Sequence, residues 1–219
     1  MPYQMNVSKR GRMRALFVAA CISVIVMRSW SQTATSASSR IHDLYLADQS
    51  ENPGNISEAD YYKHGDARRA EIRQMLDGGQ VQSGSDFHDA AAIYQHGRSA
   101  DDYLLAHILA IEAISRGDNS SKWFAAATLD RYLQKLGQPQ IFGTQFPADP
   151  KTPKSPPKQQ VDVRVANVIR TQAPFDPQLV PASLRKDFCV PDLSQQQKNL
   201  AIFNTGHYPE NRVTPDCGR

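Results

Sequence analysis

The amino-acid sequence predicts a mainly α protein, built as an antiparallel helix bundle with an irregular C-terminal region that could include a short β-strand. Segments near the centre each begin at a serine able to cap a helix, carry apolar residues three or four apart, and stop at a glycine. These glycines stand at positions 97, 117 and 137, a period of twenty residues. One helix and one tight connection fit that period, and short connections favour antiparallel neighbours.

The three central helices are expected to follow one another closely. The first runs from a cap at Ser85 to Gly97, the second from a capping-box pattern at 99–102 to Gly117, and the third from Ser120 or Ser121 to Gly137. Alanines recur at 90–92, 106, 110, 113 and 125–127 and would let the helices approach closely.

The region before these helices is less regular. Residues 32–56 are expected to form a flexible lead-in, with a short helix at 41–47. A helical domain is predicted over 57–146. It starts at a capping-box pattern, breaks at 64–66 and resumes as a helix that stops before Gly78.

The region after the third helix is predicted to lose helical order. Residues 138–146 predict an ordered, non-helical segment, and the proline-rich stretch 147–160 predicts a linker or surface excursion. Residues 161–219 are expected to pack on the helical domain as an irregular region. Within it, alternation predicts a strand at 161–165, and a helix is expected at 194–203.

The first 31 residues have the pattern of a secretory signal peptide. Basic residues at 9–14 precede an uncharged run of thirteen residues, 15–27. A membrane-spanning helix needs about 20 apolar residues, so this run has the length of a signal-peptide core instead. Cleavage is expected after Ser31, with 35–37 as a second candidate. An uncleaved anchor and a lipoprotein cleavage at Cys21 are the alternatives.

Removal of this segment changes the composition of the chain. The full sequence has a formal charge of +3, and residues 1–31 hold five basic residues and no acidic ones, which leaves −2 for the remainder. That balance argues against a nucleic-acid partner, which calls for a basic patch or stripe. Cys189 and Cys217 are the cysteines left, and in an oxidising compartment they predict one disulfide, with two free thiols as the alternative.

Sequence motifs that identify a reaction are absent. The chain has no Gly-rich phosphate loop, no His-Glu-x-x-His, no Cys-x-x-Cys and no Gly-x-Ser-x-Gly. Its six histidines include no pair four residues apart, so a metal site would have to be assembled across helices. No metal or cofactor is predicted.

Polar residues gather instead at the ends of the predicted helices, namely Gln95, His96, Asp130, Arg131, Gln140, Thr144 and Gln145. In this arrangement the chain resembles a family of uncharacterised bacterial proteins, a domain of unknown function. Its members share a Gln-His pair, an Asp-Arg pair and a Gly-x-Pro-Gln-x-(Phe/Tyr)-Gly-Thr-Gln block, which correspond here to residues 95–96, 130–131 and 137–145. Leu184-Arg185 and Val190-Pro191-Asp192-Leu193 look similar to the family's ending. The resemblance covers about residues 66–200 and implies no activity.

Two interpretations of these polar residues remain open. In the structural one, Arg131 reaches the carbonyl groups of the following loop, while Gln140, Thr144 and Gln145 satisfy its backbone groups. In the functional one, all seven residues converge on a cleft. His96 and Asp130 would then form an acid/base pair, and the other five, Gln95, Arg131, Gln140, Thr144 and Gln145, would bind a ligand.

From these patterns we expect an exported protein, periplasmic or extracellular, that acts as a non-catalytic binding or scaffolding module of the bacterial envelope. Its partner would be a protein or a small polar ligand, with no nucleic acid and, once the signal is removed, no membrane. The alternative is a small hydrolase or lyase that uses His96 and Asp130.

Overall fold

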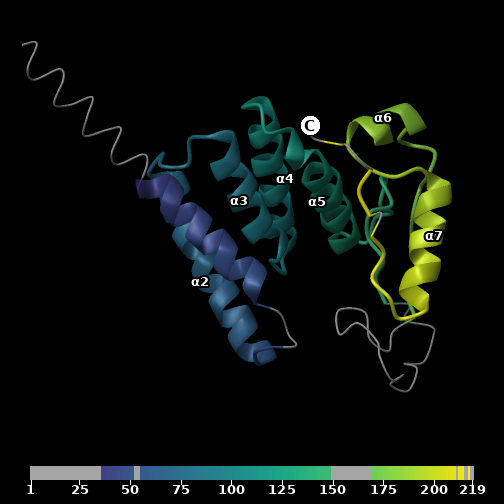
Figure 1. Ribbon diagram of the computed structural model, residues 1–219, viewed down its shortest axis with the longest axis horizontal. Coiled ribbons are helices and arrows are strands. Elements are labelled where there is room, and N and C mark those ends of the chain that lie inside the picture. The colour runs from purple at the N-terminus through teal and green to yellow at the C-terminus, as the bar shows by residue number, and fades with distance from the viewer. Residues whose placement is uncertain (1–35, 52–54, 149–168, 211, 215–216, 218–219) are drawn as a thin grey trace, which may run out of the picture.

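The computed structural model describes residues 36–51, 55–148, 169–210, 212–214 and 217. The predicted signal peptide at 1–31, most of the proline-rich stretch and the predicted strand at 161–165 lie outside these residues. The described part is mainly helical, as predicted, with its central helices side by side (Figure 1). None of its helices combines the length and the apolar character that crossing a membrane would need.

The N-terminal helix, residues 36–50, occupies a region where the sequence predicts a flexible lead-in and a helix at 41–47 only. It is longer than predicted because it docks on the bundle, burying Ile41 and Leu44. The Arg40 Nε also donates to Glu71 across 2.7 Å. Such tertiary contacts, rather than helix propensity, supply most of the stability of a short helix.

Helix α2 (Glu58–Asp77) starts where predicted but does not break at 64–66. Ser57 caps it by accepting the Asp60 N–H at 3.1 Å. Gly65 is buried inside the helix, and the Arg69 side chain lies against it. A Cβ at this position would stand 3.2 Å from the Arg69 guanidinium. Glycine at 65 therefore makes room for a neighbouring side chain and does not end the helix.

Helices α3 (Gly84–Gln95), α4 (Ala100–Ser115) and α5 (Lys122–Lys135) form the predicted bundle, with α4 between α3 and α5 (Figure 1). Alanines fill their contacts, and the fully enclosed ones are Ala90, Ala91, Ala92, Ala106, Ala110, Ala113, Ala125, Ala126 and Ala127. Small side chains let the helices approach closely, as the sequence predicts.

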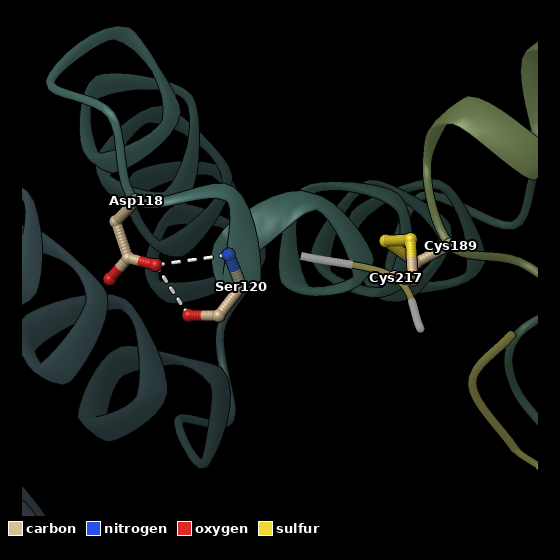
Figure 2. Close-up of a disulfide and its surroundings, with 4 residues drawn as sticks. All are labelled: Asp118, Ser120, Cys189 and Cys217. Atoms are coloured by element: carbon tan, nitrogen blue, oxygen red, sulfur yellow. Dashed lines mark hydrogen bonds between the residues drawn. A yellow bond between two sulfur atoms is a disulfide. The ribbon is translucent and has the colours of Figure 1, made fainter. Parts of the chain in front are cut away.

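The helix starts differ in part from the prediction. The capping box of Ser99 with Asp102 is present. Helix α3, however, is capped by Ser83 and not by Ser85, because Ser83 and Asp86 exchange side-chain and backbone hydrogen bonds. Before α5 a short 3-10 turn intervenes, capped by Asp118 (Figure 2).

The three periodic glycines serve two different purposes. Gly117 and Gly137 adopt positive φ angles of 92° and 73°, which favour glycine at a helix C-terminus. Gly97 does not have a positive φ. A Cβ at Gly97 would overlap the Asp102 side chain that caps the next helix, so the requirement there is space.

The C-terminal region folds back on the segment that follows α5. Residues 140–148 run beside 170–175 and form two isolated bridges, Gln140 with Phe175 and Ala148 with Arg170. Helix α7 (Leu193–Asn204) confirms the helix predicted at 194–203, whereas the short α6 (Ala182–Asp187) was not expected. The predicted disulfide joins Cys189 to Cys217, with Cα atoms 5.4 Å apart (Figure 2).

Candidate functional site

Asp130 anchors the loop that follows α5. Its Oδ1 accepts the backbone N–H groups of Ile141 at 2.8 Å and Phe142 at 3.0 Å. Its Oδ2 accepts the Thr144 N–H at 2.8 Å and the Thr144 hydroxyl at 2.7 Å. Burial raises the pKa of Asp130, and these four hydrogen bonds oppose that rise by favouring the charged form. Both carboxylate oxygens are therefore already occupied by loop donors.

Arg185 of α6 binds the other side of the same loop. Its guanidinium donates to the carbonyls of Phe142 at 2.6 Å and Ile141 at 3.1 Å. It also donates to Val180 and Pro177, and the side chain is fully enclosed. The structural interpretation gave this role to Arg131, and the structure gives it to Arg185. The reason is geometric: the C-terminal region folds over the loop and brings an arginine from 43 residues away.

Glutamine side chains complete the loop. Gln140 Nε2 donates to the Gln145 carbonyl at 3.1 Å, and its Oε1 accepts the Gln145 N–H at 3.0 Å. Gln196 of α7 donates to the Phe142 carbonyl at 2.8 Å and accepts from Gln172 at the same distance. Among the predicted ligand-binding residues, the side chains of Gln140 and Gln145 thus satisfy backbone groups, as the structural interpretation expects. The Thr144 hydroxyl instead bonds the side chains of Asp130 and Gln145.

Gly143 is the position where this loop tolerates no side chain. Its φ is +76°, and a Cβ would stand 2.5 Å from Gln196 Oε1 and 2.7 Å from Gln172 Nε2. Beside it lies a cavity of about 10 Å³, lined in part by Thr144, Asn199 and Arg212. That volume is enough for about one water molecule, so the loop is a filled polar core and not an open cleft.

His96, the C-cap residue of α3, pairs with a carboxylate that the sequence did not single out. Its Nδ1 lies 2.6 Å from Asp48 Oδ2, at the end of the N-terminal helix. Asp48 is 1 % exposed, and the His96 side chain remains 29 % exposed. Gln95 is buried at the end of α3. The hydrogen bonds of Asp130 go to the 141–144 loop, so the two proposed acid/base residues have separate partners.

The Asp48 carboxylate belongs to a chain of alternating charges. Arg68 Nε lies 3.2 Å from Asp48, and Arg68 Nη1 lies 2.8 Å from Glu51. His64 Nδ1 is 2.9 Å from the other oxygen of Glu51. Burial acts to raise the pKa of Glu51, but the hydrogen bonds from Arg68 and His64 outweigh it and hold that pKa below its ordinary value.

Arg131 lies in the last turns of α5. Its Nε is closed off from solvent and has no hydrogen-bond partner. Burial lowers the pKa of Arg131, because a charged guanidinium is poorly solvated at this position.

The residues that sequence reasoning missed have one property in common, since each acts on a partner far away in the chain. Asp48, Arg68, Gln172 and Gln196 stand in no motif. Only Arg185 had a sequence signal, because it belongs to the Leu-Arg pair in the resemblance to the uncharacterised family.

Within the described ranges, no group of three or more His, Cys, Asp or Glu side chains is arranged to hold a metal ion. Compared with known protein families, curated proteins and solved structures, the chain gives no match. Its function must therefore be inferred from the residues themselves.

Proposed function

We propose that this chain is an exported, non-catalytic binding or scaffolding module of the bacterial envelope, periplasmic or extracellular. The observation that carries the proposal is the hydrogen bonding of Asp130. A general acid or base needs a lone pair or proton that it can offer to a substrate. Asp130 instead accepts four hydrogen bonds from its own loop. We assign it to holding the loop in shape.

Export is supported by two features that agree. The segment 1–31 has the pattern of a signal peptide. The Cys189–Cys217 disulfide suits the oxidising compartments in which such bonds persist. N-terminal sequencing of the protein recovered from the periplasm or the medium would show a start at Gln32. A start at Met1 in the cytosolic fraction would contradict export.

A small hydrolase or lyase remains as a second candidate because of the His96–Asp48 pair. A histidine held through Nδ1 by a buried carboxylate is oriented to use its other nitrogen as a base. The 2.6 Å contact and the partial exposure of His96 fit that arrangement. In this version Asp48, and not Asp130, would orient the histidine.

One experiment separates the two candidates. Purified wild type, His96→Asn and Asp130→Asn would be tested against ester, amide, phosphoester and glycoside substrates, with thermal melts run in parallel. The binding module predicts no turnover in any of them and a lower Tm for Asp130→Asn. Turnover by the wild type that is lost in a folded His96→Asn protein would overturn the proposal in favour of the enzyme.

A further inference from the structure

Three pairs of a histidine with a carboxylate join the N-terminal helix, residues 36–50 (purple in Figure 1), and the residue that follows it to α2 and α3. The pairs, with the distance from Nδ1 to the carboxylate oxygen, are His42–Asp89 at 2.8 Å, His96–Asp48 at 2.6 Å and His64–Glu51 at 2.9 Å. In each pair one partner belongs to the segment 36–51 and the other to the bundle. Half of the six histidines in the sequence therefore lie at this one interface.

The carboxylate of each pair is more enclosed than the imidazole. The Asp89 side chain is 10 % exposed and its partner His42 is 57 % exposed, and the other two pairs show the same order. The imidazoles can therefore exchange protons with the solvent, and free imidazole titrates near pH 6.5. A neutral imidazole offers such a carboxylate a hydrogen bond, whereas a protonated one also offers the positive charge that an enclosed carboxylate favours.

Arg68 of α2 is the permanent positive charge within two of these pairs. Its Nε lies 3.2 Å from Asp48 and its Nη1 lies 2.8 Å from Glu51. One guanidinium thus serves two carboxylates, which leaves this group of side chains with a net negative charge while His64 and His96 are neutral. A proton on either imidazole cancels that charge, so the docked helix favours the uptake of a proton here.

The third pair lies apart from Arg68 and has its own charged neighbours. Burial raises the pKa of Asp89, and the hydrogen bond and the charge of His42 oppose that rise. His88 of α3 acts in the same direction as His42, whereas Asp86 of α3 acts against it. A proton on His42 therefore favours the ionised form of Asp89, and the two groups stabilise each other across the interface.

The remaining contacts of the helix do not change their charge near neutral pH. Burial raises the pKa of Tyr45 and the pKa of Tyr61, so both phenols keep their protons. Arg40 pairs with Glu71 of α2 at 2.7 Å, and Ile41 is fully enclosed. These contacts keep the helix on the bundle throughout this pH range, so a change in the histidines alters how tightly it is held.

We propose that the N-terminal helix is a pH-sensitive latch, which is docked most tightly in mildly acidic solution and loosens as the pH rises through neutrality. The sign follows from proton linkage: a state that takes up a proton is favoured at low pH, and that advantage is lost as the pH rises. Loosening uncovers apolar surface on the bundle, because Ile41 and Leu44 belong to the same buried cluster as Ile72 of α2 and Ala90 of α3. The latch goes beyond the proposed function and is compatible with either candidate.

The test is hydrogen exchange of the purified protein at about pH 5.5 and about pH 8, on either side of the imidazole range. The backbone amides of 36–50 are compared with those of α4, and each rate is corrected for the intrinsic effect of pH. Protection of 36–50 is expected to be about tenfold higher at the lower pH, since one proton taken up on docking changes the equilibrium constant up to tenfold per pH unit. Equal protection at both pH values, or the same change in α4, would overturn the latch.

Variants assign the effect to the three histidines. Glutamine can donate to a carboxylate but does not titrate. Replacing His42, His64 and His96 together by glutamine is therefore expected to abolish the difference between the two pH values, and a difference that persists would overturn the proposal. His207→Gln alters an exposed histidine of the C-terminal region whose Nδ1 lies near the Thr205 hydroxyl, and as the matched control it should keep the full difference.

Single variants keep the proposal testable if the triple variant does not fold. His42→Gln and His64→Gln change the two most exposed histidines of the latch. Each is expected to reduce the ratio of protection between the two pH values, because exposed ion pairs contribute modestly and the effect is shared among three of them. A ratio equal to that of the wild type in both single variants would overturn the proposal.

Discussion

Asp130→Asn is the substitution that tests the assignment of this carboxylate most directly. Asparagine keeps the size of aspartate but replaces one acceptor oxygen with an NH2 group. The amide is expected to turn its NH2 group toward Thr144, whose hydroxyl can rotate and accept, since the other orientation would face the N–H groups of both Ile141 and Phe142. The hydrogen bond of the Thr144 N–H is then lost, and the other three are made to a neutral group in place of a charged one.

The magnitude follows from these contacts. A hydrogen bond to a charged group contributes about 1.5–3 kcal/mol and a neutral one about 0.5–1.5 kcal/mol, so one bond lost and three weakened amount to roughly 4–6 kcal/mol. Removing the buried charge offsets part of that, and we expect a net loss of about 3 kcal/mol. For a chain of this size the loss lowers Tm by about 6–12 °C.

The assay is urea unfolding followed by circular dichroism, together with a thermal melt. Asp187→Asn, at an exposed aspartate in α6, is the control and should stay within about 0.5 kcal/mol of the wild type. A loss below about 1 kcal/mol for Asp130→Asn would refute the reasoning, because the loop would then not depend on the carboxylate.

Three further predictions concern the scaffold. Gly97→Ala should destabilise the protein by about 2 kcal/mol in urea unfolding, because the new methyl group overlaps Asp102. Replacing both Cys189 and Cys217 by serine should cost on the order of 3 kcal/mol for a bridge spanning 28 residues, and reduction of the wild type should reproduce that loss. Burial acts to raise the pKa of Asp86, but hydrogen bonds to its charged form hold that pKa below its ordinary value. The stabilisation of the folded protein by ionised Asp86 is thus complete above about pH 4, and it is lost as the pH falls through the lowered pKa of the folded state. In an acid titration, the free energy of unfolding of Asp86→Asn should therefore fall less steeply than that of the wild type.

Much of the helical part could be predicted because its signals are local. A cap such as Ser99 with Asp102 and a stop such as Gly117 lie within one or two turns of the helix ends they define. The errors arose where packing in the folded chain decided the outcome. The sequence predicts a break at Gly65, but in the structure the Arg69 side chain packs against this glycine inside the helix. The N-terminal helix is longer than predicted because it packs on the bundle.

The candidate site was predictable in its residue types but not in its pairings. The sequence correctly marked the loop after α5 as ordered, and it singled out Asp130 as an acid/base residue, whereas the structure bonds Asp130 to the loop. It could not assign Arg185 to the loop carbonyls or Asp48 to His96, because those partners lie 43 and 48 residues apart. No spacing rule applies over such separations, and only the folded chain brings the groups together.

The hydrogen bonds of Arg185 join residues far apart in the sequence, and this separation bears on the order in which the chain folds. The contacts of α3, α4 and α5 are between neighbours along the sequence and can form early. Until α6 packs against the loop, the carbonyls of Ile141 and Phe142 lack their Arg185 donor and are hydrated. We therefore expect Arg185→Met to leave the refolding rate nearly unchanged and to speed unfolding, since it removes a contact made after the rate-limiting step. The helices would form first, and the C-terminal region would close over the loop last.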